Sequence, residues 1–470
     1  MLRSAIPALF ILAFLTAALP AQQPPNFVFL LGEGQGWNSL SVAMDPDVPG
    51  SKSATFRTPN FERLAASGMR FANFYAPSPR CTPSRATYFT GKNPALLRMT
   101  FVSAWTPDNP RLSTPAPLLE MPAEETTIAE LLKARGYTTA HFGKWHVGRR
   151  LTPRDHGFDE SDGPTSNGGP DNIAHPNPTQ AYGIAERGMD FMERHAKAGQ
   201  PFFVQMSQYG GRDFEDALPA TVAEVQRWGL EGREAGAAAV ALDVDITVGR
   251  ILDKLEELGI AGSTYVLYTT DHGTPGRENG PLANGKGTVW EGGLRVPLLV
   301  SGPGTEPGSV SHVRVWGADL FPTIAELAGV DLALPKQLDG GSLARLLRSG
   351  GEGEVERLRE EMVFHVPHYD SDPLGPASAI ILDSYKLIRF YELDKPKLFD
   401  LSQDRGERHD LAEKLPEKTA ELDRRLTAYL AEVHADLPEP NVKFDPSKAS
   451  GERPPGRRDR RRPNRPRQNR

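Results

Sequence analysis

Apolar segments of strand length alternate with helical segments along most of the 470 residues, and this alternation limits the fold more than any other feature. Four segments have the nearly continuous apolar character of strands buried on both faces: 26–31, 138–142, 201–207 and 264–270. Helical segments with capping residues or terminal glycines are found at 58–68, 127–136 and 237–258. The sequence therefore predicts an α/β fold with a doubly wound, mostly parallel sheet flanked by helices.

The pattern changes in the last third of the chain. Short strand patterns at 364–368, 379–382 and 386–391 follow one another without helices between them, and a final helix is expected near 416–433. Such an order predicts a smaller C-terminal antiparallel sheet covered by one helix. We therefore assign 24–335 to a main α/β domain and 336–440 to a C-terminal α+β subdomain.

Both ends of the chain differ in composition from the rest. Residues 1–21 combine Arg3, a short apolar stretch and the small residue Ala21, which predicts a signal peptide and an exported protein, periplasmic or secreted. No later segment has about 18 consecutive apolar residues, so no transmembrane anchor is expected. Residues 451–470 hold nine arginines and no apolar side chain, so we expect a disordered basic tail over 448–470.

Cys81 is the only cysteine in the chain. In an exported protein a lone cysteine cannot form an internal disulfide, which leaves an inert buried residue, an intermolecular bridge or a chemical role. Thr82 and Pro83 are typical of a helix start, so we expect Thr82 as N-cap and a helix over 84–89. Cys81 would then lie at the positive end of a helix, where thiolates and anions are favoured.

Three basic residues surround this cysteine in sequence: Arg80, Arg85 and Lys92. An inert core cysteine has no need of nearby cations, although the same cations could simply face solvent. The pattern therefore favours a chemical role for Cys81 at an anion-binding helix terminus.

The stretch CTPSRATYFTG, from Cys81 to Gly91, resembles the signature C-x-P-S-R-x-x-x-x-T-G of the sulfatase family at every fixed position. The resemblance implies that a formylglycine-generating or equivalent maturation enzyme oxidises Cys81 to formylglycine. The hydrated aldehyde would attack the sulfate sulfur with one hydroxyl and expel sulfate with the other. It also implies the alkaline-phosphatase superfold and a catalytic role for Arg85, and makes 24–335 the catalytic domain.

Two further segments resemble sulfatase motifs. GKWHVG at 143–148 resembles GKWHLG, which implies that Lys144 contacts the sulfate and the nucleophile and that His146 hydrogen-bonds formylglycine. Because alternate residues of a strand share a face, Lys144 and His146 are expected to point to the same side. On its own, this pair would more often be surface residues. The segment 285–297 resembles GKGTxxEGGxRVP and implies that Lys286 binds sulfate.

The metal site departs from the family pattern. Sulfatases carry paired aspartates after the first strand as calcium ligands, and this chain has Glu33 followed by Gly34. The resemblance implies one divalent cation, Ca²⁺ or alternatively Mg²⁺, bound by Glu33, Asp271 and the modified Cys81. His272 would be a further ligand or a contact to sulfate. Gln35 or a water is expected to replace the second acid.

Substrate contacts are expected from two other regions. Arg212 stands where many sulfatases have a substrate-binding histidine, so it would bind sulfate but could not donate a proton to the leaving group. His365 and His368 either reach a substrate sugar or are structural.

The charge distribution requires a local anion site. Because the tail is strongly basic and the total charge is −6, the rest of the chain is acidic and repels a sulfated polymer at long range. Positive charge must then be concentrated at the pocket by a few residues: Arg85, Lys92, Lys144, Arg212 and Lys286.

Three functions compete at this point. The first is a formylglycine-dependent sulfatase acting on a sulfated carbohydrate or an aryl sulfate. The second is a non-catalytic relative that binds sulfated glycans, since Gly34 and Arg212 depart from the family pattern. The third, a phosphohydrolase of the same superfold, would need a serine or threonine nucleophile. No nucleic-acid partner is expected, and the oligomeric state stays open.

Overall fold

The computed structural model describes residues 24–167, 177, 179–211, 213–275, 279–330 and 337–448. The expected signal peptide, all of the expected basic tail except Lys448, and Arg212 lie outside the described residues. Within these ranges, no helix has both the length and the apolar character needed to cross a membrane.

An eight-stranded sheet forms the centre of the molecule, with the strand order β10-β2-β9-β8-β1-β7-β5-β6. Strand β9 runs antiparallel to both of its neighbours, and the other pairs are parallel. The strands are β1 (Asn26–Gly32), β2 (Met69–Phe71), β5 (Thr138–Gly143), β6 (Glu160–Ser161), β7 (Phe202–Ser207), β8 (Thr264–Thr270), β9 (Leu298–Ser301) and β10 (Ser309–Ser311). The predicted mostly parallel sheet is confirmed, with each of the four expected strands in it.

Strand β1 lies between β7 and β8 and is buried on both faces. Phe27, Phe29 and Leu31 pack into the core on one side of the sheet, and Val28 and Leu30 pack into the core on the other side. A strand that serves two cores needs apolar residues at consecutive positions, which accounts for the continuous run at 26–31.

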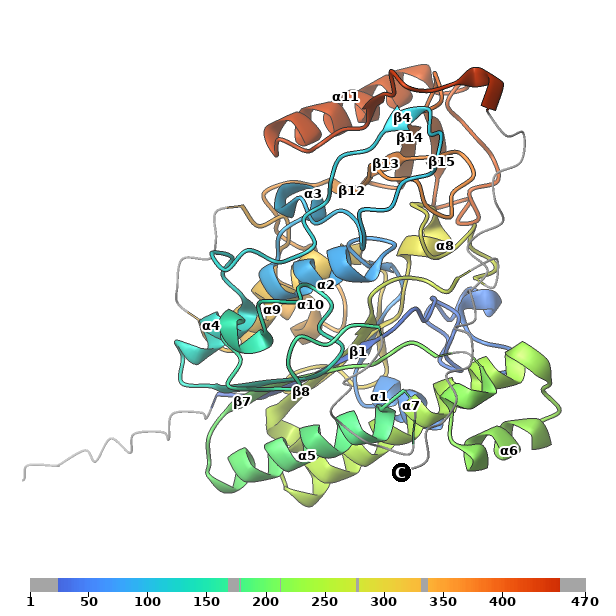
Figure 1. The fold of residues 1–470 in the computed structure, drawn as a ribbon. Coiled ribbons are helices and arrows are strands. Elements are labelled where there is room, and N and C mark those ends of the chain that lie inside the picture. Colours follow the sequence, from blue (N-terminus) through green and yellow to red (C-terminus); the bar gives the residue numbers. More distant parts are fainter. Residues whose placement is uncertain are drawn as a thin grey trace, which may run out of the picture.

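Helices cover both faces of this sheet (Figure 1). One face carries α2 (Cys81–Thr90), α3 (Pro94–Leu97), α4 (Ile128–Lys133), α9 (Leu320–Leu327) and α10 (Ala344–Arg348). The other face carries α1 (Pro59–Ala66), α5 (Ala181–Lys197), α6 (Pro219–Arg227) and α7 (Gly232–Glu257). Helix α7 begins at Gly232, five residues before the expected position 237, with Glu231 as its N-cap.

A second, antiparallel sheet lies beyond the first, as the sequence predicts. Its strands are β12 (Met362–Val366), β13 (Ala377–Leu382), β14 (Tyr385–Phe390) and β15 (Lys397–Asp400), and α11 (Pro416–Glu432) packs on it. Strand β15 was not expected, because its four residues give too short an alternation to recognise. The proposed domain boundary at 335 falls within 331–336, outside the described residues.

Two short ribbons complete the strand pairing. They join β3 (Phe74–Tyr75) to β11 (Val315–Trp316) and β4 (Leu112–Ser113) to β16 (Glu439–Pro440). The second ribbon connects the chain between α3 and α4 to the C-terminal end of the described structure.

Candidate active site

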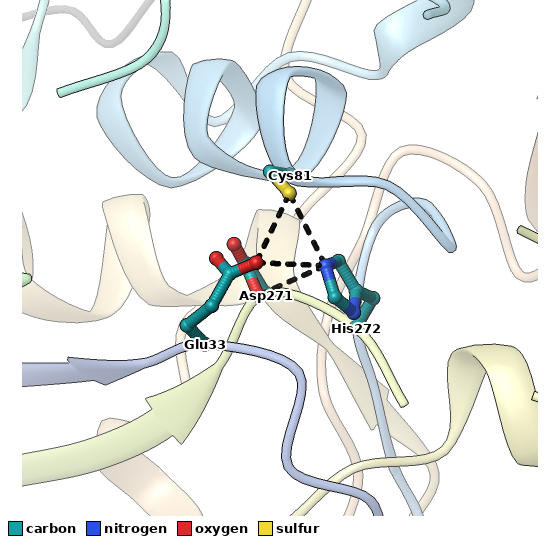
Figure 2. Close-up of side chains that lie close together, drawn as sticks. All are labelled: Glu33, Cys81, Asp271 and His272. Atoms are coloured by element: carbon teal, nitrogen blue, oxygen red, sulfur yellow. Dashed lines mark hydrogen bonds and ion pairs between the residues drawn. The ribbon is translucent and has the colours of Figure 1, made fainter. Parts of the chain in front are cut away.

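Polar side chains gather where the parallel strands of the main sheet end. Glu33 follows β1, Lys144 follows β5 and Asp271 follows β8, so three strands that are far apart in sequence bring these residues to one edge. The N-terminus of α2, which carries Cys81, faces the same edge (Figure 2). Ligands of open α/β sheets bind at the carboxyl ends of the strands, and the position therefore defines a candidate active site.

Helix α2 begins at Cys81 and not after Thr82. Its N-cap is Arg80, and the Thr82 hydroxyl donates to the backbone oxygen of His146 over 2.8 Å. The prediction of Thr82 as N-cap is therefore wrong, because this hydroxyl joins the helix to the next loop. Cys81 is 3% exposed, in the first turn of the helix. The helix ends at Gly91, as expected, with a left-handed φ of 69°.

The four residues expected at the metal site lie together in the structure. The Cys81 thiol donates to Glu33 Oε1 over 3.4 Å, and its sulfur lies 3.2 Å from His272 Nε2 (Figure 2). His272 Nε2 lies 3.4 Å from Asp271 Oδ1. One ligand atom from each residue falls within 4.8 Å of the others.

Three cations surround the two carboxylates. Arg85 Nε donates to Asp271 Oδ2 over 3.0 Å, and its Nη2 lies 3.2 Å from Glu33 Oε2. Lys144 Nζ lies 2.7 Å from the same Glu33 oxygen. Lys286 Nζ lies 3.3 Å from Glu33 Oε1 and 3.9 Å from the Cys81 sulfur. The site is therefore a buried network of opposite charges around the thiol.

This network shifts the pKa of its members in opposite directions. Burial and Glu33 raise the pKa of the Cys81 thiol, but Lys144, Lys286 and His272 outweigh them and leave it well below the ordinary value. Burial, together with the charge of Glu33, raises the pKa of Asp271 to about 7. Burial disfavours the imidazolium of His272, yet attraction by Asp271 raises its pKa to about 9. The environment of residue 81 thus stabilises negative charge on it.

Lys144 and His146 lie in a turn at the site, whereas the sequence predicted that they belong to a strand. Strand β5 ends at Gly143, and His146 has a φ of 59°, so the two residues lie in a turn and not on one face of a strand. The alternation argument is wrong for this reason. Burial lowers the pKa of His146, and a hydrogen bond with Cys81 opposes that shift. His146 nevertheless lies against residue 81, as expected.

Two residues near Cys81 in sequence have other partners. Lys92 lies beyond the C-terminal end of α2 and pairs with Glu125, with 2.5 Å between Nζ and Oε2. The prediction that it adds charge to the anion site is therefore wrong. Arg80 pairs with Asp370, which follows β12 of the second sheet. Asp370 was missed because no local pattern connects it with the signature at 81–91.

Gly34 stands where the family pattern has its second acidic metal ligand, and the structure shows the contacts of Gly34 and Gln35. Gly34 contributes its backbone amide, which donates to Asp271 Oδ1 over 3.1 Å. The side-chain oxygen of Gln35 accepts a hydrogen bond from the Tyr268 hydroxyl. Gln35 thus has a protein partner, and the replacement of the second acid by Gln35 or water stays a prediction.

The two C-terminal histidines are buried in the second sheet and its loops. His365 Nδ1 lies 2.7 Å from Ser378 Oγ, and its Nε2 lies 3.1 Å from the Asp436 backbone oxygen. His368 stacks on Phe101 and lies 2.8 Å from Thr100 Oγ1. These contacts support the structural alternative for both residues.

The comparisons with known proteins agree with this geometry. Residues 25–330 match the family model "Sulfatase", and residues 284–436 match "N-sulphoglucosamine sulphohydrolase, C-terminal". The chain belongs to the sulfatase family and is a sulfuric ester hydrolase.

Individual relatives cover most of the chain. It is 35% identical to the N-acetylgalactosamine-6-sulfatase of Sus scrofa, over 73% of this chain and 69% of the relative. It is 30% identical to the arylsulfatase A of Homo sapiens, over 85% and 86% of the two chains. The two family models together span the main sheet and the second sheet.

Solved structures share the fold. The structure of Ps i-CgsB in complex with k-i-k-neocarrahexaose has a TM-score of 0.73 at 21% identity and covers 90% of this chain and 96% of that one. The PsFucS1 sulfatase from Pseudoalteromonas sp. has a TM-score of 0.69 at 21% identity, covering 90% and 92%. A further structure, in complex with its substrate D-glucosamine-2-N,6-O-disulfate, has a TM-score of 0.64 at 20% identity, covering 87% and 98%.

Proposed function

We propose that the protein hydrolyses a sulfate ester of a carbohydrate, with residue 81 matured from cysteine to formylglycine. The observation that carries this proposal is the position of Cys81, buried at the N-terminus of α2 and surrounded by Lys144, Lys286 and His272. The names of the relatives support a carbohydrate substrate, since N-acetylgalactosamine-6-sulfatase names a sulfated sugar. A solved neighbour holds a disulfated glucosamine.

A divalent cation is part of the proposal, and the donor set fits one. Two buried carboxylates, Glu33 and Asp271, converge with His272 and residue 81 within 4.8 Å. Hard carboxylate oxygens favour Ca²⁺, with Mg²⁺ as the alternative. When bound, such a cation would polarise a sulfate oxygen and stabilise an ionised hydroxyl on residue 81.

Lys286 would bind the sulfate itself. Its side chain is 20% exposed, whereas those of Lys144 and Arg85 are fully buried. Burial lowers the pKa of Lys286, but attraction by Cys81 and Glu33 outweighs this effect, so the ammonium stays charged. It can therefore donate to a sulfate oxygen while it remains 3.9 Å from the reacting residue.

Arg85 acts through other residues and is a positioning residue in this proposal. Its three donor groups bind Asp271, Glu33 and the Lys144 backbone oxygen, the last over 2.5 Å. It therefore holds both carboxylates and the Lys144 turn in one arrangement. His146 remains a hydrogen-bond partner of residue 81, and we retain Arg212 as a proposed sulfate ligand outside the described residues.

Export is the setting that we propose for this chemistry. The predicted signal peptide over 1–21 would deliver the chain to the periplasm or the medium, and a maturation enzyme would modify Cys81 on the way. The basic tail is not assigned a partner.

A desulfation screen tests the proposed function. Mature wild-type protein would be incubated with N-acetylgalactosamine 6-sulfate, D-glucosamine 2-N,6-O-disulfate, sulfated polysaccharides and 4-nitrophenyl sulfate, and released sulfate would be measured by ion chromatography. We expect release from at least one carbohydrate and none from a Cys81→Ala variant. Release from the aryl sulfate alone would contradict the carbohydrate assignment.

A further inference from the structure

A short helix, α8 (Glu291–Leu294), contacts both the candidate active site and the second sheet. Trp290, directly before the helix, packs on Phe399 of β15, with 5.5 Å between the ring centroids, and α8 lies next to this sheet in Figure 1. Toward the site, the Gly293 oxygen accepts a hydrogen bond of 3.0 Å from the amide of Gly273, in the turn after β8. Helix α8 therefore joins the second sheet to the edge where the charged residues gather.

The loop that carries Lys286 closes onto this helix. The Gly292 amide donates to the Ala283 oxygen over 2.8 Å, so the two ends of the segment 283–292 meet at α8. The approach is close, because a Cβ added at Gly292 would lie 2.5 Å from that oxygen. Within the loop, Lys286 Nζ lies 3.9 Å from the Cys81 sulfur. A shift of α8 would therefore move the base of the loop that holds this ammonium.

A carboxylate from the region of the second sheet holds the first residue of α8. Glu407, in the segment that follows β15, accepts a hydrogen bond of 2.7 Å from the Glu291 amide with its Oε2. Its Oε1 lies 2.8 Å from Lys386 Nζ of β14, and the same ammonium lies 2.9 Å from Glu291 Oε1. All three side chains are fully buried. Glu407 thus uses both of its oxygens to connect the backbone of α8 with a strand of the second sheet.

The backbone of Glu407 has an uncommon conformation. Its φ is 51°, in the left-handed region that residues other than glycine rarely adopt. Such a conformation persists only where the surrounding structure enforces it. Here Asp404 Oδ2 accepts hydrogen bonds from the amides of Arg408 and His409, over 2.7 and 2.8 Å. The turn around Glu407 is therefore held in a conformation that directs its carboxylate to α8.

We infer that Glu407 is a positioning residue for sulfate binding, because it fixes α8 and, through α8, the loop that places the Lys286 ammonium. This inference rests on the proposed function, in which Lys286 binds the sulfate. Glu407 itself would touch neither the sulfate nor the metal, since Glu291 and Lys386 occupy both of its oxygens.

Glu407→Gln tests the inference by a measurement that does not depend on turnover. An amide side chain has one oxygen, so it cannot accept from both the Glu291 amide and the Lys386 ammonium. We expect the dissociation constant of inorganic sulfate to rise by about 10-fold, since a displaced Lys286 loses its contact with the anion. Calorimetry with sodium sulfate on the mature protein measures this constant. Burial and the charge of Glu291 outweigh Lys386 and raise the pKa of Glu407 to about 7, so the carboxylate is ionised at about pH 8.

A double variant separates positioning from a general loss of stability. Lys286→Ala alone should weaken sulfate binding by about 10- to 100-fold, the size of a charged hydrogen bond. Adding Glu407→Gln to Lys286→Ala should change the affinity by less than about 2-fold, because the group that Glu407 positions is already gone. Wild-type sulfate affinity in Glu407→Gln would overturn the inference, as would effects that multiply in the double variant.

Asp245→Asn is the matched control. Asp245 is also fully buried, and it accepts hydrogen bonds from the amides of Asn60 and Phe61 in the first turn of α1, on the other face of the main sheet. The substitution removes a comparable buried charge from a helix start outside the charged cluster. It should lower the urea midpoint of unfolding and leave the sulfate affinity at the wild-type value.

Glu407→Asp is a milder variant that keeps the charge and shortens the side chain. It should bind sulfate with an affinity between those of wild type and Glu407→Gln. If Glu407→Gln does not fold, wild-type affinity in Glu407→Asp would overturn the inference. Failure of wild type to release sulfate from any carbohydrate, while it binds inorganic sulfate, would instead refute the proposed function, so the two failures are distinguishable.

Discussion

Lys144 and Glu33 form a buried ion pair beside the candidate nucleophile, with 2.7 Å between Nζ and Oε2. The lysine side chain is fully buried, and that of the glutamate is 8% exposed. Glu33 uses its other oxygen to face Cys81, Lys286 and His272. A single carboxylate therefore connects the proposed metal site with the proposed sulfate site.

The first prediction concerns this carboxylate. Glu33→Gln keeps the shape of the side chain and removes its charge, and calcium affinity falls with the charge of the ligands, so we expect a loss of at least about 10-fold. Calorimetry with Ca²⁺ on protein stripped with EDTA measures the affinity. Glu125→Gln, which affects only the pair with Lys92, is the control and should bind as wild type. Unchanged affinity in Glu33→Gln would show that the metal lies elsewhere.

The second prediction concerns Asp370. It binds the Arg80 guanidinium directly before the nucleophile and lies against Gly287, where an added Cβ would be 2.7 Å from its Oδ2. Asp370→Ala should free Arg80 and misplace the start of α2, lowering kcat by about 10- to 100-fold. Asp370→Glu should recover part of the rate, which a simple loss of stability would not explain. A wild-type kcat in Asp370→Ala would show that Asp370 does not position the start of α2 for the reaction.

The third prediction concerns a buried charge cluster between the two sheets. Lys386 of β14 lies 2.9 Å from Glu291 and 2.8 Å from Glu407, and all three side chains are fully buried. Lys386→Met leaves two buried carboxylates without their shared partner and should lower the free energy of unfolding by about 3–5 kcal/mol. The exposed pair of Lys395 and Glu413 provides the control, because Lys395→Met should cost less than about 1 kcal/mol. Urea unfolding measures both values, and equal effects would contradict the prediction.

The fourth prediction concerns pH and the buried His365. Burial lowers its pKa to about 4, below the ordinary value near 6.5. The unfolded chain therefore binds a proton that the folded chain does not, between about pH 6.5 and 4, and stability falls with falling pH in that window. The contribution of one such group is about 1.4 kcal/mol per pH unit. His365→Gln should reduce the measured slope by that amount, and an unchanged slope would show that this histidine does not titrate as described.

Much of the fold could be predicted because the apolar patterns are local. Strand β1 needs apolar residues on both faces, and that requirement is visible in 26–31 without knowledge of its neighbours. Strand β15 could not be predicted in the same way, because four residues with partly exposed ends resemble any loop. The N-cap of α2 was misplaced by two residues, at Thr82 instead of Arg80, because Thr82, a good cap by type, bonds to a distant loop instead.

The site was predictable where a motif or a strand end fixes a residue. Glu33, Asp271 and His272 follow strands β1 and β8, so parallel pairing brings them to one edge. Lys92 could not be placed correctly. It is near Cys81 in sequence, but the whole length of α2 separates the two residues in space. Asp370 belongs to a contact between distant segments, and no local pattern marks it.

The most direct test of the central claim is the mass of the peptide that begins at residue 81. Trypsin cuts after Arg80 and Arg85, so residues 81–85 are released as one short peptide. Mass spectrometry of active protein from a host with the maturation machinery should show the mass of formylglycine at position 81, and activity should scale with its fraction. Active protein that contains only unmodified cysteine at this position would contradict the account.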